Sequence, residues 1–247
     1  MTKITNCFAL IFILFLFLVL GTNSTQFIFK NNCPNIVWPG TLTGSGPALP
    51  TTGFTLNPGA TYNFVAAPSW SGRIWARTLC SQDATTQKFV CETADCASGQ
   101  VLCNGAGAIP PATLVEFTLN GSGNLDFYDV SLVDGYNLPV SVVPTNRQSC
   151  KSTGCPANIN RSCPPELQLK DAHSGAVIAC KSACLAFNKP EFCCTGAYGK
   201  PQTCPPTKYS NIFKSLCPQA YSYAYDDKTS TFTCPSGSSD YTITFCP

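Results

Sequence analysis

Apolar and polar positions alternate along several segments of the chain, and this period of two predicts β-strands. Phe27 and Phe29 share one side of the segment 25–30, and Tyr241 and Ile243 share one side of 241–246. The other segments of this kind are 72–78, 113–119, 125–133 and 138–143. Because strands are predicted at both ends and in the middle, we expect the two terminal strands to pair in one sheet.

Residues 150–217 follow a different pattern, because two short segments there, 179–187 and 209–217, have the spacing of helices. The same region holds nine of the 17 cysteines. It is predicted to form a disulfide-rich lobe against a β core. A second, smaller loop-rich lobe is predicted around four further cysteines, Cys80, Cys91, Cys96 and Cys103.

Residues 1–24 have the composition of a signal peptide. Lys3 gives a short positive start, the run 7–20 is apolar throughout, and small residues follow it up to Ser24. The run is shorter than the ~20 residues that a transmembrane helix needs, and no later stretch is as apolar. We therefore expect cleavage after Ser24, secretion, and no transmembrane segment in the mature protein.

The 17 cysteines indicate a disulfide-bonded protein of an oxidising compartment. Cys7 leaves with the signal peptide, and the even number that remains indicates an oxidising compartment and a fold held by disulfides with no free thiol. Zinc ligation is the alternative for closely spaced cysteines. His173 is the only histidine, so we predict no metal and no cofactor.

Charged residues are sparse, at 11% of the chain, and unevenly placed. Residues 89–146 contain no Lys or Arg but include Glu92, Asp95, Glu116, Asp126, Asp129 and Asp134. Basic residues prevail over 147–217, so the chain is expected to have one acidic and one basic surface. Nucleic acid is excluded as a partner, because the basic residues are scattered and lack a basic–aromatic motif.

Several short motifs identify a family. They are CETADCASG at 91–99 followed by Cys103, PPATL at 110–114, FYDVSLVDG at 127–135, YSYAYDD at 221–227, Phe192 before Cys193 and Cys194, and FCP at 245–247. Together they resemble thaumatin-like proteins, the plant pathogenesis-related group five, over the whole mature chain. VWPGTL at 37–42 and TAD at 93–95 are most similar to the fruit allergen-type branch. Ala94, Gln87-Lys88 and Phe192 depart from the Gly, Gly-Arg and Tyr of many members.

The resemblance implies a mainly β fold: a β-sandwich core with two disulfide-rich lobes and a cleft between the core and the larger lobe. The core would comprise 25–77, 117–156 and 218–247, the small lobe 78–116, and the large lobe, with short helices, 157–217. The implied disulfides are Cys33–Cys246, Cys80–Cys91, Cys96–Cys103, Cys150–Cys234, Cys155–Cys217, Cys163–Cys180, Cys184–Cys193 and Cys194–Cys204.

The resemblance also implies a set of cleft residues: Arg73, Glu116, Asp129, Asp134 and either Asp226 or Asp227, with Asp226 preferred. Glu116 projects from the polar face of its predicted strand, and Asp129 and Asp134 are assigned to the next strand, so three carboxylates can converge. Crowded carboxylates raise one another's pKa values, and Arg73 would offset part of that repulsion. The alternative for each carboxylate taken alone is a solvated or turn-capping group.

We predict from these residues a secreted, monomeric plant defence protein with an acidic cleft that binds fungal cell-wall β-1,3-glucan. The alternative is a weak endo-β-1,3-glucanase with Glu116 as acid and Asp134 as nucleophile or base. A structural or taste-active protein is a third possibility. The near-neutral charge disfavours it, because sweetness in relatives accompanies a basic surface.

Other features have two interpretations. Arg73, Trp75 and Arg77 form a sugar-stacking or cation–π ladder, or Trp75 is packed in the structure. The alternating Tyr221, Tyr223 and Tyr225 line the cleft floor or form a strand edge. His173 is read as a solvated loop residue. Asn120 and Asn160 begin N-glycosylation sequons in turn-like sequence.

Overall fold

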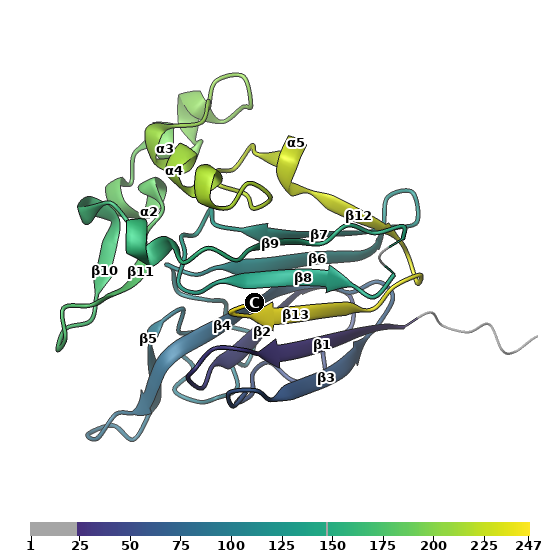
Figure 1. Cartoon of the computed structure of the whole chain (residues 1–247), viewed down its shortest axis with the longest axis horizontal. Helices are drawn as coiled ribbons and strands as arrows, with labels where there is room; N and C mark the ends of the chain where they lie inside the picture. Colours follow the sequence, from purple (N-terminus) through teal and green to yellow (C-terminus); the bar gives the residue numbers. More distant parts are fainter. Residues whose placement is uncertain (1–23, 147) are drawn as a thin grey trace, which may run out of the picture.

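Two β-sheets pack face to face in this computed structural model, which describes residues 24–146 and 148–247 (Figure 1). The predicted signal peptide lies outside the described residues except for Ser24. The first sheet is five-stranded, in the order β3-β1-β13-β8-β9. Its strands are β1 (Thr25–Asn31), β3 (Thr61–Ala66), β8 (Val140–Pro144), β9 (Thr153–Cys155) and β13 (Tyr241–Phe245).

The second sheet has the order β12-β7-β6-β4-β2, and β5 pairs with the far end of β4. Its strands are β2 (Trp38–Ser45), β4 (Ser71–Gln82), β5 (Phe89–Thr93), β6 (Leu114–Gly121), β7 (Leu125–Ser131) and β12 (Phe232–Pro235). Strands β4, β6 and β7 lie side by side, and they position the candidate site described below.

The terminal strands pair as the sequence predicts. β1 runs parallel to β13 with Phe27 opposite Tyr241, and the Cys33–Cys246 disulfide closes the same pair of segments. The inward side of both strands is aromatic: the ring centroids of Phe27 and Phe117 are 4.7 Å apart, and those of Phe117 and Tyr241 are 5.0 Å apart. Burial of these alternating side chains is what fixes the strand register.

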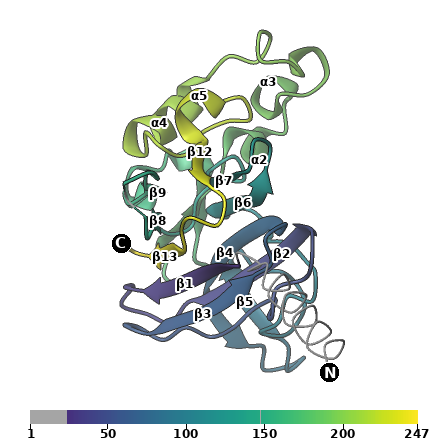
Figure 2. The ribbon, with the colours of Figure 1, turned by 90° about the vertical axis from the view of Figure 1, so that its right-hand side faces the viewer.

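The large lobe lies at the top of Figure 2, beyond β12 and β7 at one edge of the second sheet. Its elements are η1 (Ile159–Ser162), η2 (Pro165–Leu167), β10 (Gln168–Lys170), β11 (Val177–Cys180), α2 (Ala183–Phe187), α3 (Pro190–Cys193), η3 (Gly196–Tyr198) and α4 (Lys208–Leu216). The short helix α5 (Asp227–Ser230) precedes β12. The predicted helix at 209–217 is confirmed as α4, which begins with a Thr207–Ser210 capping box.

The helix predicted at 179–187 is wrong in its first part. Residues up to Cys180 form β11, which pairs antiparallel with β10, and the helix begins only at Ala183. Ser182 ends the strand and caps the helix, because its hydroxyl accepts a hydrogen bond from the Leu185 N–H. The strand predicted at 125–133 ends at Ser131, before a turn.

Eight disulfides hold the fold together, and they are the eight pairs that the family resemblance implies. They are Cys33–Cys246, Cys80–Cys91, Cys96–Cys103, Cys150–Cys234, Cys155–Cys217, Cys163–Cys180, Cys184–Cys193 and Cys194–Cys204. The Cys33–Cys246, Cys150–Cys234 and Cys155–Cys217 bridges join distant parts of the chain, whereas the others close short loops within the lobes.

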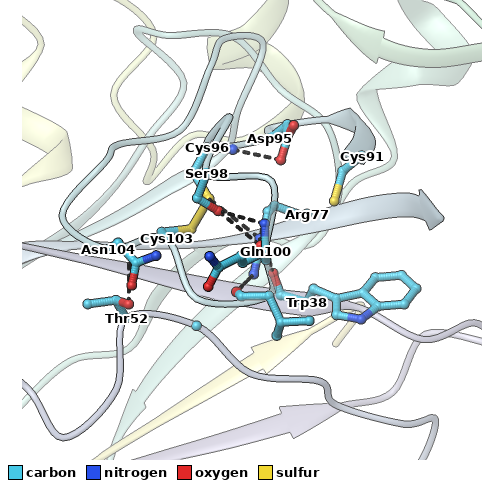
Figure 3. The surroundings of a disulfide bond; sticks show 12 residues. Trp38, Thr52, Arg77, Cys91, Asp95, Cys96, Ser98, Gln100, Cys103 and Asn104 are labelled. Carbon is cyan, nitrogen blue, oxygen red and sulfur yellow. Dashed lines mark hydrogen bonds between the residues drawn. A yellow bond between two sulfur atoms is a disulfide. The ribbon is translucent and has the colours of Figure 1, made fainter. Parts of the chain in front are cut away.

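Of the two interpretations of Arg73, Trp75 and Arg77, packing of Trp75 is confirmed and the sugar-stacking ladder is excluded, because Trp75 and Arg77 are fully buried. The Trp75 indole donates to the Ala94 carbonyl. The Arg77 guanidinium donates to the carbonyls of Trp38 in the core and Gln100 in the small lobe (Figure 3). Burial lowers the pKa of the Arg77 guanidinium to about 10, so this group remains charged at neutral pH. Its hydrogen bonds connect the small-lobe loop at Gln100 to the core at Trp38.

Candidate functional site

Three ionisable side chains form a row across the outer face of the second sheet. Arg73 on β4 pairs in register with Glu116 on β6, and Glu116 pairs with Asp129 on β7. Directly opposed residues on neighbouring strands have Cβ atoms ~5 Å apart, so the three groups interact. Their chain neighbours Val115 and Val130 point the other way and are fully buried.

The row lies along a hollow. The turn after β7 and the segment before α5 form the remaining walls of this hollow. This hollow, about 340 Å³ in volume, is lined by the row, by Asp134 and by Tyr221. We call these five residues (Arg73, Glu116, Asp129, Asp134 and Tyr221) the acidic groove. A second hollow of about 360 Å³ shares the row and extends the groove over Ser71 and Thr118. Ser71 lies two positions from Arg73 on β4, and Thr118 lies two positions from Glu116 on β6. The alternating pattern of each strand could therefore have placed both hydroxyl groups on the groove face.

Arg73 and Glu116 form an ion pair in which the Arg73 Nε donates to Glu116 Oε1 at 2.7 Å. Their side chains are 53% and 32% exposed. A pair this exposed contributes about 1 kcal/mol or less to stability. Within the groove, the ion pair holds a guanidinium and a carboxylate in a fixed orientation.

Asp129 is the electrostatically unusual member of the groove. Burial raises its pKa to about 8, and the negative charges of Glu116 and Asp227 act in the same direction, against the opposing effect of Arg73. Its Oδ1 atom is buried and has no hydrogen-bond partner within the described ranges. Asp129 is therefore mainly a neutral carboxylic acid below pH 8. The rise in its pKa has the direction that crowded carboxylates predict, but desolvation is the larger cause of it.

Asp134 belongs to the groove but not to a strand, contrary to the sequence-based assignment. It lies in the turn after β7, and its carbonyl accepts a hydrogen bond from the Ala112 N–H at 3.1 Å. The next residue, Gly135, has a φ of +92° and would place a Cβ atom 2.7 Å from the Cys180 carbonyl oxygen. Only glycine fits there, and this turn directs Asp134 toward the groove.

Neither Asp226 nor Asp227 lines the two hollows of the acidic groove. Asp226 accepts hydrogen bonds from the backbone and hydroxyl of Ser222 and forms an ion pair with Lys214 at 2.9 Å, so it holds its loop against α4. Asp227 instead accepts a hydrogen bond from the Tyr221 hydroxyl at 2.8 Å and raises the pKa of Asp129. Of the two aspartates, Asp227 is thus the one whose charge acts on Asp129.

The three alternating tyrosines do not form a strand. Tyr221 lines the acidic groove, as one interpretation expected, but the chain turns after it and Tyr223 lines a different hollow. His173 lies in the turn between β10 and β11. Across residues 24–146 and 148–247, no three His, Cys, Asp or Glu side chains are grouped to hold a metal ion. No helix in these same ranges is long and apolar enough to cross a membrane.

The two sequons lie in different environments, and we expect a glycan on Asn120 but none on Asn160. Asn120 is exposed at the end of β6. The Asn160 Nδ2, the atom that would carry a sugar, donates to the carbonyls of Asn137 at 3.2 Å and Ile178 at 3.0 Å. Peptide mass mapping of the secreted protein before and after glycan removal tests this, and a glycan on Asn160 of natively folded protein would contradict it.

Comparisons with known proteins identify the family of the chain. Residues 31–247 match the thaumatin family. The chain is 61% identical to thaumatin-like protein 1a of Malus domestica, with 92% of each chain covered. It is 52% identical to pathogenesis-related protein 5 of Arabidopsis thaliana, covering 96% of this chain and 97% of that protein.

Two further comparisons concern sugar-related proteins. The chain is 58% identical, with 92% of each covered, to a Prunus avium protein named glucan endo-1,3-beta-glucosidase. A β-1,3-glucanase domain from Clostridium beijerinckii shares the fold, with a TM-score of 0.54, 9% identity, and coverage of 90% of this chain and 98% of that domain. By its sequence and its disulfide-bonded sandwich, the chain belongs to the thaumatin family, as a thaumatin-like protein of the pathogenesis-related group 5 type.

Proposed function

We propose that this is a secreted, monomeric plant defence protein whose acidic groove binds β-1,3-glucan of the fungal cell wall. The observation that carries the proposal is the row of Arg73, Glu116 and Asp129 in register on an exposed sheet face, with Asp134 closing the hollow. Carboxyl groups and a guanidinium offer acceptors and donors to several sugar hydroxyls at once. The name of the Prunus avium relative supports glucan as the sugar.

The alternative is a weak endo-β-1,3-glucanase that uses Glu116 and Asp134. Glycoside hydrolysis needs one protonated and one ionised carboxyl group beside the scissile bond. The groove contains carboxyls in unlike environments, since Glu116 is paired with Arg73 whereas Asp129 is largely buried. In this alternative Asp129 is a third group able to hold a proton, beside the two that the sequence indicates.

One assay separates the two functions. Wild type, Glu116→Gln and Asp134→Asn are incubated with insoluble β-1,3-glucan and, separately, with laminarin; Glu92→Gln, an exposed acid on β5, is the matched control. We expect both groove variants to bind insoluble glucan about tenfold more weakly, the equivalent of one or two lost hydrogen bonds, and the control to bind as wild type does.

The products distinguish binding from catalysis. Reducing ends released from laminarin by wild type, but by neither groove variant, would favour the enzyme. Binding without products favours the binding protein. If wild type binds no glucan, or if growth inhibition of fungi survives both groove substitutions, the role proposed for the acidic groove is wrong.

A further inference from the structure

A smaller hollow lies on the large-lobe side of Asp134. Its volume is about 150 Å³, and its wall is mainly carbon, with Leu132 from the turn after β7, Phe192 from α3, Phe213 from α4 and Tyr223. We call it the apolar pocket. Neither the sequence motifs nor the function proposed above accounts for it.

The apolar pocket is continuous with the acidic groove. Val133, Asp134 and Ala224 line both hollows. A ligand seated against Asp134 in the groove therefore has a second contact surface of different chemistry directly beside it.

Most of the hydroxyl groups in the pocket wall already have partners within the protein. The Ser182 hydroxyl accepts from the Leu185 N–H, and the Ser210 hydroxyl and Thr207 N–H are bonded to each other at 2.8 Å in the capping box of α4. The Tyr209 hydroxyl donates to Glu166 at 2.9 Å. Away from the carboxylates of Asp134 and Glu191, water inside the pocket would thus find few partners, and an apolar group that displaces it gains free energy.

The shape and charge of the pocket limit what it accepts. Two disulfides, Cys184–Cys193 and Cys194–Cys204, lie in its wall and hold α2 and α3 in place. Its lining includes the acids Asp134 and Glu191 but neither Lys nor Arg, so an anionic ligand is repelled. A cavity of ~150 Å³ with an apolar wall accommodates a group of the size of benzene.

We propose that the protein also binds β-glucosides with a small, uncharged apolar aglycone: the sugar occupies the acidic groove and the aglycone enters the apolar pocket. This inference rests on the sugar-binding function proposed for the groove. It goes beyond that function by naming a ligand class, glycosides with an apolar aglycone. Unsubstituted glucan has no such aglycone.

The test compares two laminaritriosides that differ only in the aglycone, the methyl and the phenyl 1-thio-β-glycosides, whose sulfur linkage resists hydrolysis. Affinities are measured by protein-detected NMR titration. We expect the phenyl compound to bind about ten- to thirtyfold more tightly, the gain for burying one aromatic ring. Contacts from its ring protons to Phe213 and Tyr223 are expected as well.

Two variants locate the effect. Leu185 lines the pocket and is 38% exposed, so Leu185→Glu places a charge at its mouth without disturbing the core. Leu102→Glu, at an exposed leucine of the small lobe, is the matched control. The phenyl advantage should fall below threefold in Leu185→Glu and persist in Leu102→Glu.

The titrations distinguish a failure of the apolar-pocket inference from a failure of the sugar-binding function proposed for the groove. If both glycosides bind equally, or if the phenyl advantage survives Leu185→Glu, the apolar-pocket inference is overturned while sugar binding stands. If neither glycoside binds, the proposed function of the groove fails and the inference fails with it.

Discussion

Replacing Asp129 with asparagine is expected to stabilise the folded protein at neutral pH and to flatten the pH dependence of its stability. The fold raises the pKa of Asp129 from its ordinary 3.8 to about 8. Between these two values the folded protein holds a proton that the unfolded chain releases. The contribution of Asp129 to wild-type stability therefore decreases as the pH rises from about 4 to about 8, by at most ~1.4 kcal/mol per pH unit.

Asparagine is neutral in both states, so it removes this penalty while keeping the size of the side chain. We expect Asp129→Asn to gain about 2–4 kcal/mol at pH 7 and almost nothing at pH 4. Guanidinium unfolding at pH 4, 5.5 and 7, with all disulfides intact, gives the free energies of unfolding. Glu92→Gln is the control and should parallel wild type. An Asp129→Asn curve with the wild-type slope would show that Asp129 is ionised in the fold.

A stabilised Asp129→Asn variant would also bear on function. A buried acid with an unpartnered oxygen costs free energy, and proteins retain such groups where an activity needs them. Asp129 lines both hollows of the groove, beside Glu116. We therefore regard its cost to stability as support for a ligand-binding role of the groove, independent of which sugar occupies it.

The sequence predicts much of this groove, because a period of two determines which side chains share a face of a strand. It placed Glu116 on the polar side of its strand, opposite Val115 and Phe117, and the structure agrees. It does not supply the register between strands. That Arg73, Glu116 and Asp129 form one row depends on pairing between residues 43 and 13 positions apart, and the family resemblance, not the periodicity, brought them together.

The surroundings of Arg77 and of the Asp226–Asp227 pair could not be predicted from the period of two, because they depend on local contacts that the pattern does not encode. Arg77 alternates with Arg73 and so shares one face of its predicted strand, but the small-lobe loop covers Arg77 and supplies carbonyl partners. Asp226 and Asp227 are adjacent and chemically identical, and only the positions of Lys214 and Tyr221 separate their roles. Both cases depend on contacts made by segments far from the residue in question.

The second large effect concerns the Cys33–Cys246 disulfide, whose removal is expected to cost about 4–5 kcal/mol of unfolding free energy. The bridge spans 213 residues, the longest separation of the eight. In the chain-entropy model a cross-link stabilises by restricting the unfolded chain, and the effect increases with the logarithm of the loop length. The Cys150–Cys234 bridge, nested inside, shortens the effective loop, but a logarithm makes that correction small.

The matched control is the Cys96–Cys103 bridge, which closes only seven residues and should cost about 2 kcal/mol when removed. Each pair is replaced by serines, and the free energies of unfolding in guanidinium are compared with that of wild type. β1 and β13 remain hydrogen-bonded without the bridge, so the double variant Cys33→Ser, Cys246→Ser should still fold. If both removals cost the same, loop entropy does not govern these bridges. Their contribution would then arise from contacts in the folded state, and the longest bridge would have no special role in joining the ends of the chain.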